Sequence, residues 1–255
     1  MRSEDPSVLE RSARPPDATW PYGRLPDQVA DLYLASTGQQ PRAVVVVVHG
    51  GFWRPAYDRT HARPLASALA DDGYLVVSLE YRRVPGRPDA TIADLAAALS
   101  ALPPVLTDHA AALVPAVIVG HSAGGHLGLL LSADDAIGLP CLALAPVADL
   151  AAAEQLDLGA GAVAAFLGAS ARDRPDLDPA QDAAPRHSVT VIHGADDSIV
   201  PVAISASYAS AHPGNMRRIV APDCAHFELI DPRSTVWPLV QTELARLVLN
   251  ERREP

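Results

Sequence analysis

The sequence predicts an α/β protein in which helices cover both faces of a mostly parallel sheet. Short apolar runs alternate with stretches of helical periodicity along the chain, and this alternation implies right-handed crossovers between parallel strands. Residues 43–48 are continuously apolar and β-branched after the first position, which is typical of a strand buried on both faces. With 255 residues, 49% of them hydrophobic, the chain suffices for one large domain that buries about three quarters of the surface its unfolded form exposes.

The first part of the chain is predicted to be an N-terminal arm over residues 1–27. Prolines and charged residues dominate this stretch, a composition that gives either an arm laid over the surface or a partly disordered tail. The globular domain is expected over residues 28–255. It begins with an edge strand at residues 29–34, followed by the first central strand at residues 43–48.

The remaining elements follow from the periodicity of the apolar residues. Strands are predicted at residues 75–79, 116–119, 141–145, 189–192 and 218–220, and helices at residues 60–72, 90–102 and 237–250. Residues 147–186 separate two strands by more than one crossover helix requires. They are expected to form either a small lid insertion or an ordinary helix with long loops.

The charge of the chain argues against several classes of partner. A net charge of −10 and an isoelectric point near 5.2 repel nucleic acids and anionic lipid surfaces. Cys141 and Cys224 lack the spacing of a metal site and suit a reducing compartment. The N-terminal residues contain no apolar signal core. We therefore expect a cytoplasmic protein that acts on a small molecule, without metal, cofactor, nucleic acid or membrane; an edge strand or the last helix could pair two copies in a homodimer.

The pattern G-x-S-x-G occurs at residues 120–124, between the apolar run 116–119 and a helical stretch. Between a strand and a helix this pattern is a nucleophile elbow, a strained turn that holds the serine Oγ over the carboxyl edge of the sheet. A Cβ at Gly120 or Gly124 would collide with the neighbouring backbone. Ser122 is therefore the candidate nucleophile.

A serine nucleophile needs a base that accepts its proton and an acid that orients the base. Asp197 follows the strand 189–192, and His226 follows the strand 218–220. The chain order serine, aspartate, histidine is the one expected when an elbow serine meets its partners at successive strand ends. We assign His226 as general base and acid and Asp197 as its orienting carboxylate, with His193 and Asp196 as competing candidates.

Two glycines, Gly50 and Gly51, follow the valine strand almost directly. They allow the backbone to turn so that its N–H groups point at the carbonyl oxygen of a bound acyl group. The N–H of the residue after the nucleophile completes such a site. Gly51, Phe52 and Ala123 are therefore the predicted oxyanion hole.

These motifs resemble the α/β-hydrolase superfamily, and within it the branch that holds arylformamidases (kynurenine formamidases) and related small carboxylesterases. The branch is marked by H-G-G-x-W, present at residues 49–53, by G-H-S-A-G-G-H at residues 120–126, and by H-G-x-x-D-x-x-V-P at residues 193–201. The resemblance spans about residue 22 to the C-terminus. It implies an α/β-hydrolase fold with at most a small lid.

Three aromatic residues, Trp53, Phe227 and Tyr81, are candidate walls of the substrate pocket, because an aromatic face stacks well on an aryl ring. Core packing is the alternative for Trp53. The arginines that follow Tyr81, Arg82 and Arg83, could bind a substrate carboxylate through a forked guanidinium or pair with local acids.

Other histidines are expected to be structural. His49 should brace the oxyanion loop, and His121 and His126 should pack or support the site rather than react. For His61 the sequence offers no functional argument and suggests a surface position.

The sequence thus predicts a serine hydrolase that cleaves a small ester or amide through an acyl-serine intermediate. The resemblance implies arylformamidase activity first, the conversion of N-formylkynurenine to kynurenine and formate, with a short-acyl carboxylesterase or lactonase as the alternative. A short-peptide peptidase and a non-catalytic binding module with the same fold are more distant alternatives. An aromatic content of 5% argues against a large aromatic cleft.

Overall fold

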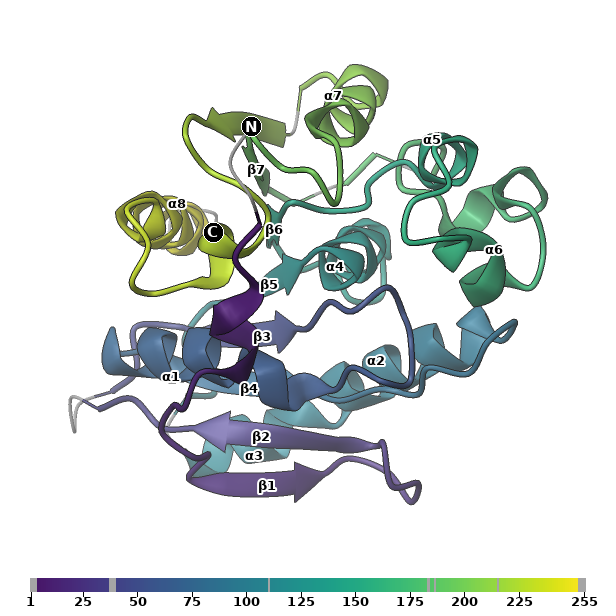
Figure 1. The fold of residues 1–255 in the computed structure, drawn as a ribbon. Coiled ribbons are helices and arrows are strands. Elements are labelled where there is room, and N and C mark those ends of the chain that lie inside the picture. The colour runs from purple at the N-terminus through teal and green to yellow at the C-terminus, as the bar shows by residue number, and fades with distance from the viewer. Residues whose placement is uncertain are drawn as a thin grey trace.

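The computed structural model describes residues 4–36, 40–109, 111–182, 184–185, 187–214 and 216–251. They fold around an eight-stranded sheet with the order β1-β2-β4-β3-β5-β6-β7-β8 (Figure 1). β4, β3, β5, β6, β7 and β8 pair in parallel, whereas β1 and β2 are antiparallel. The strands are β1 (Ala18–Pro21), β2 (Val29–Tyr33), β3 (Val44–Val48), β4 (Leu75–Leu79), β5 (Ala116–His121), β6 (Cys141–Leu144), β7 (Val189–Gly194) and β8 (Met216–Ala221). The predicted α/β class is confirmed.

Helices cover both faces of the sheet. One face packs against α1 (Arg63–Asp71) and α8 (Trp237–Glu251). The other face packs against α2 (Pro88–Ser100), α3 (Leu102–Asp108), α4 (Ala123–Ala133), α5 (Leu150–Gln155), α6 (Ala162–Leu167) and α7 (Val202–Ala211). Short 3-10 helices are η1 (Pro6–Glu10), η2 (Arg59–Ala62), η3 (Ala171–Asp173), η4 (Pro175–Leu177) and η5 (Phe227–Ile230).

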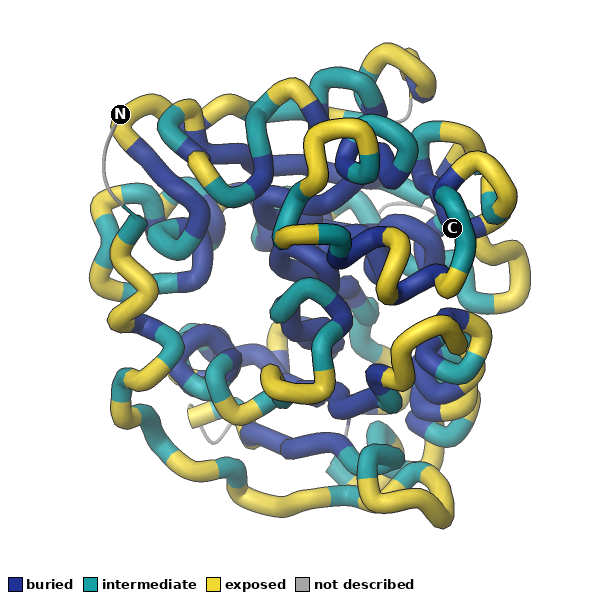
Figure 2. The backbone as a smooth tube through the Cα atoms, turned by 45° about the vertical axis from the view of Figure 1, so that its right-hand side comes forward, coloured by how far each residue is buried: buried dark blue, intermediate teal, exposed yellow. Residues whose placement is uncertain are grey.

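The valine strand β3 shows why its sequence has no polar alternation. Val44, Val46 and Val48 belong to the core on the α4 side, and Val45 and Val47 to the core on the α1 and α8 side. All of them are fully buried, and Figure 2 shows buried backbone running through the middle of the molecule. A parallel sheet covered on both faces requires apolar side chains at successive positions.

The N-terminal part of the chain differs from the expectation. β1 pairs with β2, with Trp20 opposite Ala30, so residues 18–21 form the edge of the sheet and the predicted edge strand lies one position further in. Three of the four β1 residues are exposed, so the strand lacks the apolar pattern that would identify it. Before β1, the chain crosses the carboxyl ends of the strands from the β7 side (Figure 1).

The described residues between 147 and 185 include α5, α6 and two 3-10 turns, η3 and η4. Phe166 of α6 is buried, and its ring stacks on Trp53 with centroids 4.7 Å apart. This insertion therefore packs onto the segment that follows β3.

One helical stretch, Pro88–Asp108, is long and apolar enough to cross a membrane by length and composition alone. In the structure it is divided between α2 and α3. Leu95 and Leu102 pack into the core, and the buried Asp94 pairs with Arg82 at 2.7 Å. Through these contacts the stretch packs against the sheet of this domain.

Candidate active site

Ser122 lies on the turn between β5 and α4. Its backbone has φ 56° and ψ −119°, a strained conformation for a residue with a Cβ. The glycines on either side are required by contact: a Cβ on Gly120 would lie 2.3 Å from the Gly124 carbonyl oxygen, and one on Gly124 would lie 2.1 Å from the Val48 carbonyl oxygen. The turn therefore has the geometry that the G-x-S-x-G pattern predicts.

His226 and Asp197 meet at the same edge of the sheet, where they follow β8 and β7. His226 Nδ1 lies 2.7 Å from Asp197 Oδ2, and both side chains are buried. The other oxygen of Asp197 accepts the N–H groups of Ile199 at 2.9 Å and Val200 at 2.8 Å. Burial alone would raise the pKa of Asp197, but hydrogen bonds from His193, His226 and Val200 hold it well below its ordinary value.

Neither of the competing candidates, His193 and Asp196, occupies the position of the base or of its orienting acid. His193 Nε2 is 2.7 Å from the Val200 carbonyl oxygen and 3.3 Å from Asp197 Oδ2. It therefore supports the loop that carries Asp197. Asp196 is only partly buried, and it is Asp197 that contacts the His226 ring.

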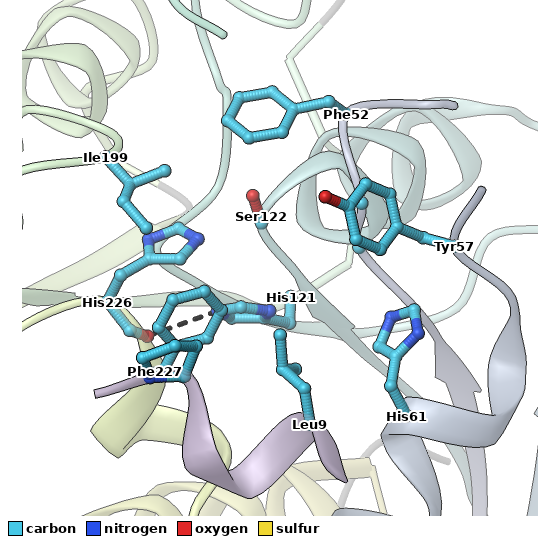
Figure 3. A pocket seen from close by; sticks show the side chains of 12 residues that line it. Leu9, Phe52, Tyr57, His61, His121, Ser122, Ile199, His226 and Phe227 are labelled. Carbon is cyan, nitrogen blue, oxygen red and sulfur yellow. Dashed lines mark hydrogen bonds between the residues drawn. The ribbon is translucent and has the colours of Figure 1, made fainter. Parts of the chain in front are cut away.

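A cavity of about 180 Å³, here the Ser122 cavity, opens beside these groups. Its lining residues are Pro6, Leu9, Gly50, Gly51, Phe52, Tyr57, His61, His121, Ser122, Ile199, His226 and Phe227. Figure 3 shows the free ring nitrogen of His226 facing the side of the cavity where Ser122 lies, with Phe52 and Tyr57 across from it. The serine and the histidine thus share one small, mostly apolar space.

The predicted oxyanion loop has an unusual backbone. Gly51, Phe52 and Trp53 have φ values of 112°, 54° and 54°, so three successive residues adopt positive φ. Within the described chain, the N–H groups of Gly51 and Phe52 donate to no backbone carbonyl. Ala123 is the first residue of α4, where backbone N–H groups have no partner within the helix.

Contacts from the α5–α6 insertion and from Glu80, the residue directly after β4, hold this loop. Arg54 donates to the Gly159 carbonyl, and a Cβ on Gly159 would lie 2.6 Å from the Phe52 ring. On the other side, His49 lies 2.8 Å from the Gly50 carbonyl oxygen through Nδ1 and 3.1 Å from Glu80 through Nε2. Burial lowers the pKa of His49 to about 3, in keeping with a bracing role.

Two of the predicted pocket walls are wrong. Phe227 lines the Ser122 cavity, but Trp53 and Tyr81 do not. Trp53 is 3% exposed because it packs between Phe166 and His126. Tyr81 is fully buried, stacks on His49 and donates from its hydroxyl to the His49 carbonyl at 2.7 Å.

The arginines after Tyr81 are also engaged. Arg82 forms a forked pair with Asp94, with both contacts at 2.7 Å, and Arg83 donates to the buried Glu80. Pairing with local acids is therefore the interpretation that holds for both.

Two polar residues of the cavity, Tyr57 and His61, are not among the candidates that the sequence motifs indicate. His61 is not a surface residue without a role: it is partly buried, contacts the Tyr57 ring edge to face, and lines the cavity. Burial lowers its pKa to about 4, so it is neutral at pH 7. Neither residue belongs to a motif, and only their spacing after the oxyanion loop could have drawn attention to them.

His121 and His126 have different surroundings. His121 lines the cavity, with Nε2 3.2 Å from the His226 carbonyl oxygen and its ring 4.5 Å from the His226 ring. It therefore fixes the position of the loop that carries His226. His126 is fully buried and its Nε2 lies 2.8 Å from the Leu177 carbonyl oxygen, which ties α4 to the insertion. In the described part of the chain, no group of three or more histidine, cysteine, aspartate or glutamate residues could hold a metal ion.

A family model described as BD-FAE matches residues 30–137 of this chain. Over 116 residues the chain is 28% identical to kynurenine formamidase of Danio rerio, a match that covers 45% of this chain and 38% of the relative. Over 99 residues it is 35% identical to the probable carboxylic ester hydrolase LipM of Mycobacterium tuberculosis, covering 38% of this chain and 22% of the relative. The matched segments thus span well under half the length of either relative.

Similarity to solved structures extends over nearly the whole chain. A crystal structure of esterase B from Lactobacillus rhamnosis superposes with a TM-score of 0.78 at 21% identity, covering 97% of this chain and 92% of the other. At this identity the likeness is one of fold.

Proposed function

We propose that this chain, which has an α/β-hydrolase fold, is a serine hydrolase. It cleaves small esters or amides through an acyl-serine intermediate. The observation that carries the proposal is the pair of His226 and Asp197, 2.7 Å apart, at one cavity with a serine held on a strained elbow. Strained backbone is retained at functional sites when the surrounding structure enforces it.

The proposed reaction begins when His226 Nε2 accepts the Ser122 hydroxyl proton as Oγ attacks the substrate carbonyl carbon. Asp197 accepts the hydrogen bond that Nδ1–H of His226 donates, which keeps Nε2 available as the base. When the tetrahedral intermediate collapses, His226 returns the proton to the departing alcohol or amine. Water then attacks the acyl-serine, His226 accepts its proton, and the carboxylic acid is released as Ser122 is reprotonated.

The negative oxygen of the tetrahedral intermediate would face the N–H groups of Gly51, Phe52 and Ala123. These donors are fixed before the substrate binds, and they meet a charge that develops only in the transition state. Each such donor contributes roughly 10²- to 10³-fold to kcat. The packing of the α5–α6 insertion on Phe52 and Arg54 supports this role, because it holds the loop against relaxation.

The size of the Ser122 cavity points to small substrates. A cavity of about 150 Å³ accommodates a benzene molecule, so a cavity of about 180 Å³ takes one ring or a short acyl chain. Its lining is mostly apolar, and outside the triad its polar side chains are those of Tyr57, His61 and His121. Short-acyl esters with an uncharged leaving group fit this lining best, and the similarities to LipM and esterase B support that choice.

Arylformamides are the second candidate class. The similarity to the kynurenine formamidase of Danio rerio favours them, and a formyl group is the smallest acyl group. N-formylkynurenine, however, carries an amino-acid carboxylate, and none of the described residues that line the cavity is an arginine or lysine. Arg82 and Arg83, the sequence-based candidates for that contact, are paired with Asp94 and Glu80.

The test compares kcat/KM for p-nitrophenyl acetate, p-nitrophenyl butyrate and N-formyl-L-kynurenine on the wild type and on Ser122→Ala. We expect an ester to be hydrolysed at or above about 10⁴ M⁻¹s⁻¹, covalent labelling by a fluorophosphonate, and loss of both in Ser122→Ala. A higher kcat/KM for the formamide would make arylformamidase the assignment. A folded wild type that neither turns over a substrate nor is labelled would overturn the proposal and leave the non-catalytic binding module.

A further inference from the structure

The N-terminal segment, residues 4–11, lies against the Ser122 cavity. Pro6 and Leu9 line the cavity although they are far from Ser122 in sequence. Figure 3 shows Leu9 reaching from this segment toward His121. Val8, between them, is 1% exposed and belongs to the core cluster that includes residues of α8 and η5, so the segment is anchored on its inner side.

The segment has a defined local structure. Asp5 caps η1 by accepting the Ser7 N–H at 3.0 Å, and Pro6 occupies its first turn. At the other end Arg11 pairs with Asp231, and both side chains are mostly buried. A segment fixed at both ends presents Leu9 to the cavity in one position.

Glu4 joins this segment to the loops of the triad. Its Oε1 accepts the N–H and the hydroxyl of Ser198, each at 2.9 Å, and its Oε2 accepts the N–H of His226 at 3.0 Å. Ser198 follows Asp197 directly. The Glu4 carboxylate therefore bridges the loop that carries Asp197 and the loop that carries His226. Its hydrogen bonds are charge-assisted, and such bonds are stronger than neutral ones.

We propose that residues 4–11 are a specificity-determining wall of the active site, in which Leu9 limits the length of the acyl group or alcohol bound at Ser122 and Glu4 is the positioning residue that holds the wall to the loops of Asp197 and His226. The inference rests on the proposed hydrolase function. It adds a substrate-size filter formed by a part of the chain that none of the catalytic motifs includes. Shortening the Leu9 side chain lengthens the space beside Ser122, and lengthening it closes that space.

The first experiment measures kcat/KM of the wild type, Leu9→Ala and Leu9→Trp for p-nitrophenyl acetate, butyrate, hexanoate and octanoate. A matched series of acetate esters with alcohols of increasing size separates the acyl side from the alcohol side. In one of the two series, Leu9→Ala should raise the ratio of the longest to the shortest substrate by at least about tenfold, since one methylene in a fitted pocket changes kcat/KM by about tenfold or more. Leu9→Trp should lower that ratio.

Leu25→Ala is the matched control, because Leu25 is 43% exposed and does not line the cavity. It should leave both ratios unchanged. Melting temperatures of all variants separate a change of specificity from loss of structure. Ratios that stay within twofold of the wild type in both Leu9 variants would overturn the inference while leaving the hydrolase proposal intact. A wild type inactive on every ester and unlabelled by a fluorophosphonate would overturn both.

The second experiment tests Glu4 with Glu4→Gln, which keeps the shape but places an amide NH₂ against a backbone N–H. We expect Glu4→Gln to widen the preference in the same direction as Leu9→Ala and also to lower kcat on p-nitrophenyl acetate by about threefold or more, because the His226 loop loses a charge-assisted bond. Glu10→Gln, on the exposed side of the same segment, should change neither. An unchanged length preference in Glu4→Gln would show that Glu4 does not hold the wall.

Discussion

Asp197→Asn tests the candidate triad with the fewest other changes. In the wild type, one carboxylate oxygen accepts hydrogen bonds from the N–H groups of Ile199 and Val200. The other accepts a hydrogen bond from Nδ1–H of His226. Asparagine retains only one oxygen. Turning its NH₂ toward the two backbone donors would leave them unsatisfied, at about 1–3 kcal/mol each. The oxygen therefore stays on the backbone, the NH₂ faces Nδ1, and the His226 proton moves to Nε2, where it faces Ser122.

A histidine in that tautomer cannot accept the serine proton. The same substitution in the chymotrypsin-type triad lowers kcat by about 10⁴-fold, and we expect a similar loss here, about 5.4 kcal/mol in the activation free energy. The assay is kcat and KM on p-nitrophenyl acetate, with KM expected to change little because Asp197 does not line the Ser122 cavity. Melting temperature and circular dichroism verify that the variant is folded.

The neighbouring Asp196 supplies the matched control, since it is partly buried and its side chain does not contact the His226 ring. Asp196→Asn should retain kcat within about twofold of the wild type. The reasoning is refuted if Asp197→Asn keeps kcat within tenfold of the wild type while folded, because His226 would then not depend on Asp197 for its tautomer.

Three further predictions concern stability and packing. Gly124→Ala should lower the free energy of unfolding by about 3 kcal/mol or more, since its Cβ would lie 2.1 Å from a carbonyl oxygen of β3; an unchanged melting temperature would contradict the elbow geometry. Trp53→Phe should destabilise the protein through weaker packing on Phe166 but leave the ratio of hexanoate to acetate hydrolysis unchanged, and a shift of that ratio would return Trp53 to the pocket. Burial lowers the pKa of His49 to about 3 and of His126 to about 4, so the unfolded chain, with histidine near pKa 6.5, binds more protons from pH 6.5 down to those values. Stability should therefore fall as pH decreases through this window, by at most about 1.4 kcal/mol per pH unit for each histidine, and urea unfolding at pH 7 and pH 5 that gives equal free energies would exclude it.

The sequence contains enough local information to predict the parallel strands and the order of the site residues. Residues such as Ser122, Asp197 and His226 follow strands whose apolar runs are unmistakable, and parallel strands bring their carboxyl ends to one edge. The steric demand on Gly120 and Gly124 is equally local. These features could be predicted because each depends on a few neighbouring positions.

The lining of the Ser122 cavity could not be predicted in the same way. Tyr81 and Trp53 follow strands that end at the correct edge, but the direction of a side chain after a strand depends on the turn that it makes, and both point into the core. Leu9 reaches the cavity only because the N-terminal segment docks across the sheet, a long-range contact with no periodic pattern. β1 was missed for a related reason, since most of its residues are exposed.

The three successive residues with positive φ, at positions 51–53, link the proposed oxyanion hole to the α5–α6 insertion. Helices of six residues are marginal in isolation, so α5 and α6 exist through their packing, and part of that packing is on Phe52 and Trp53. If this unit opens locally before the sheet unfolds, the loop loses the contacts that keep its backbone in place. On heating, such a molecule would lose its hydrolase activity while its sheet is still intact. The amide hydrogens of the insertion would then exchange at lower temperature than those of β3 and β5.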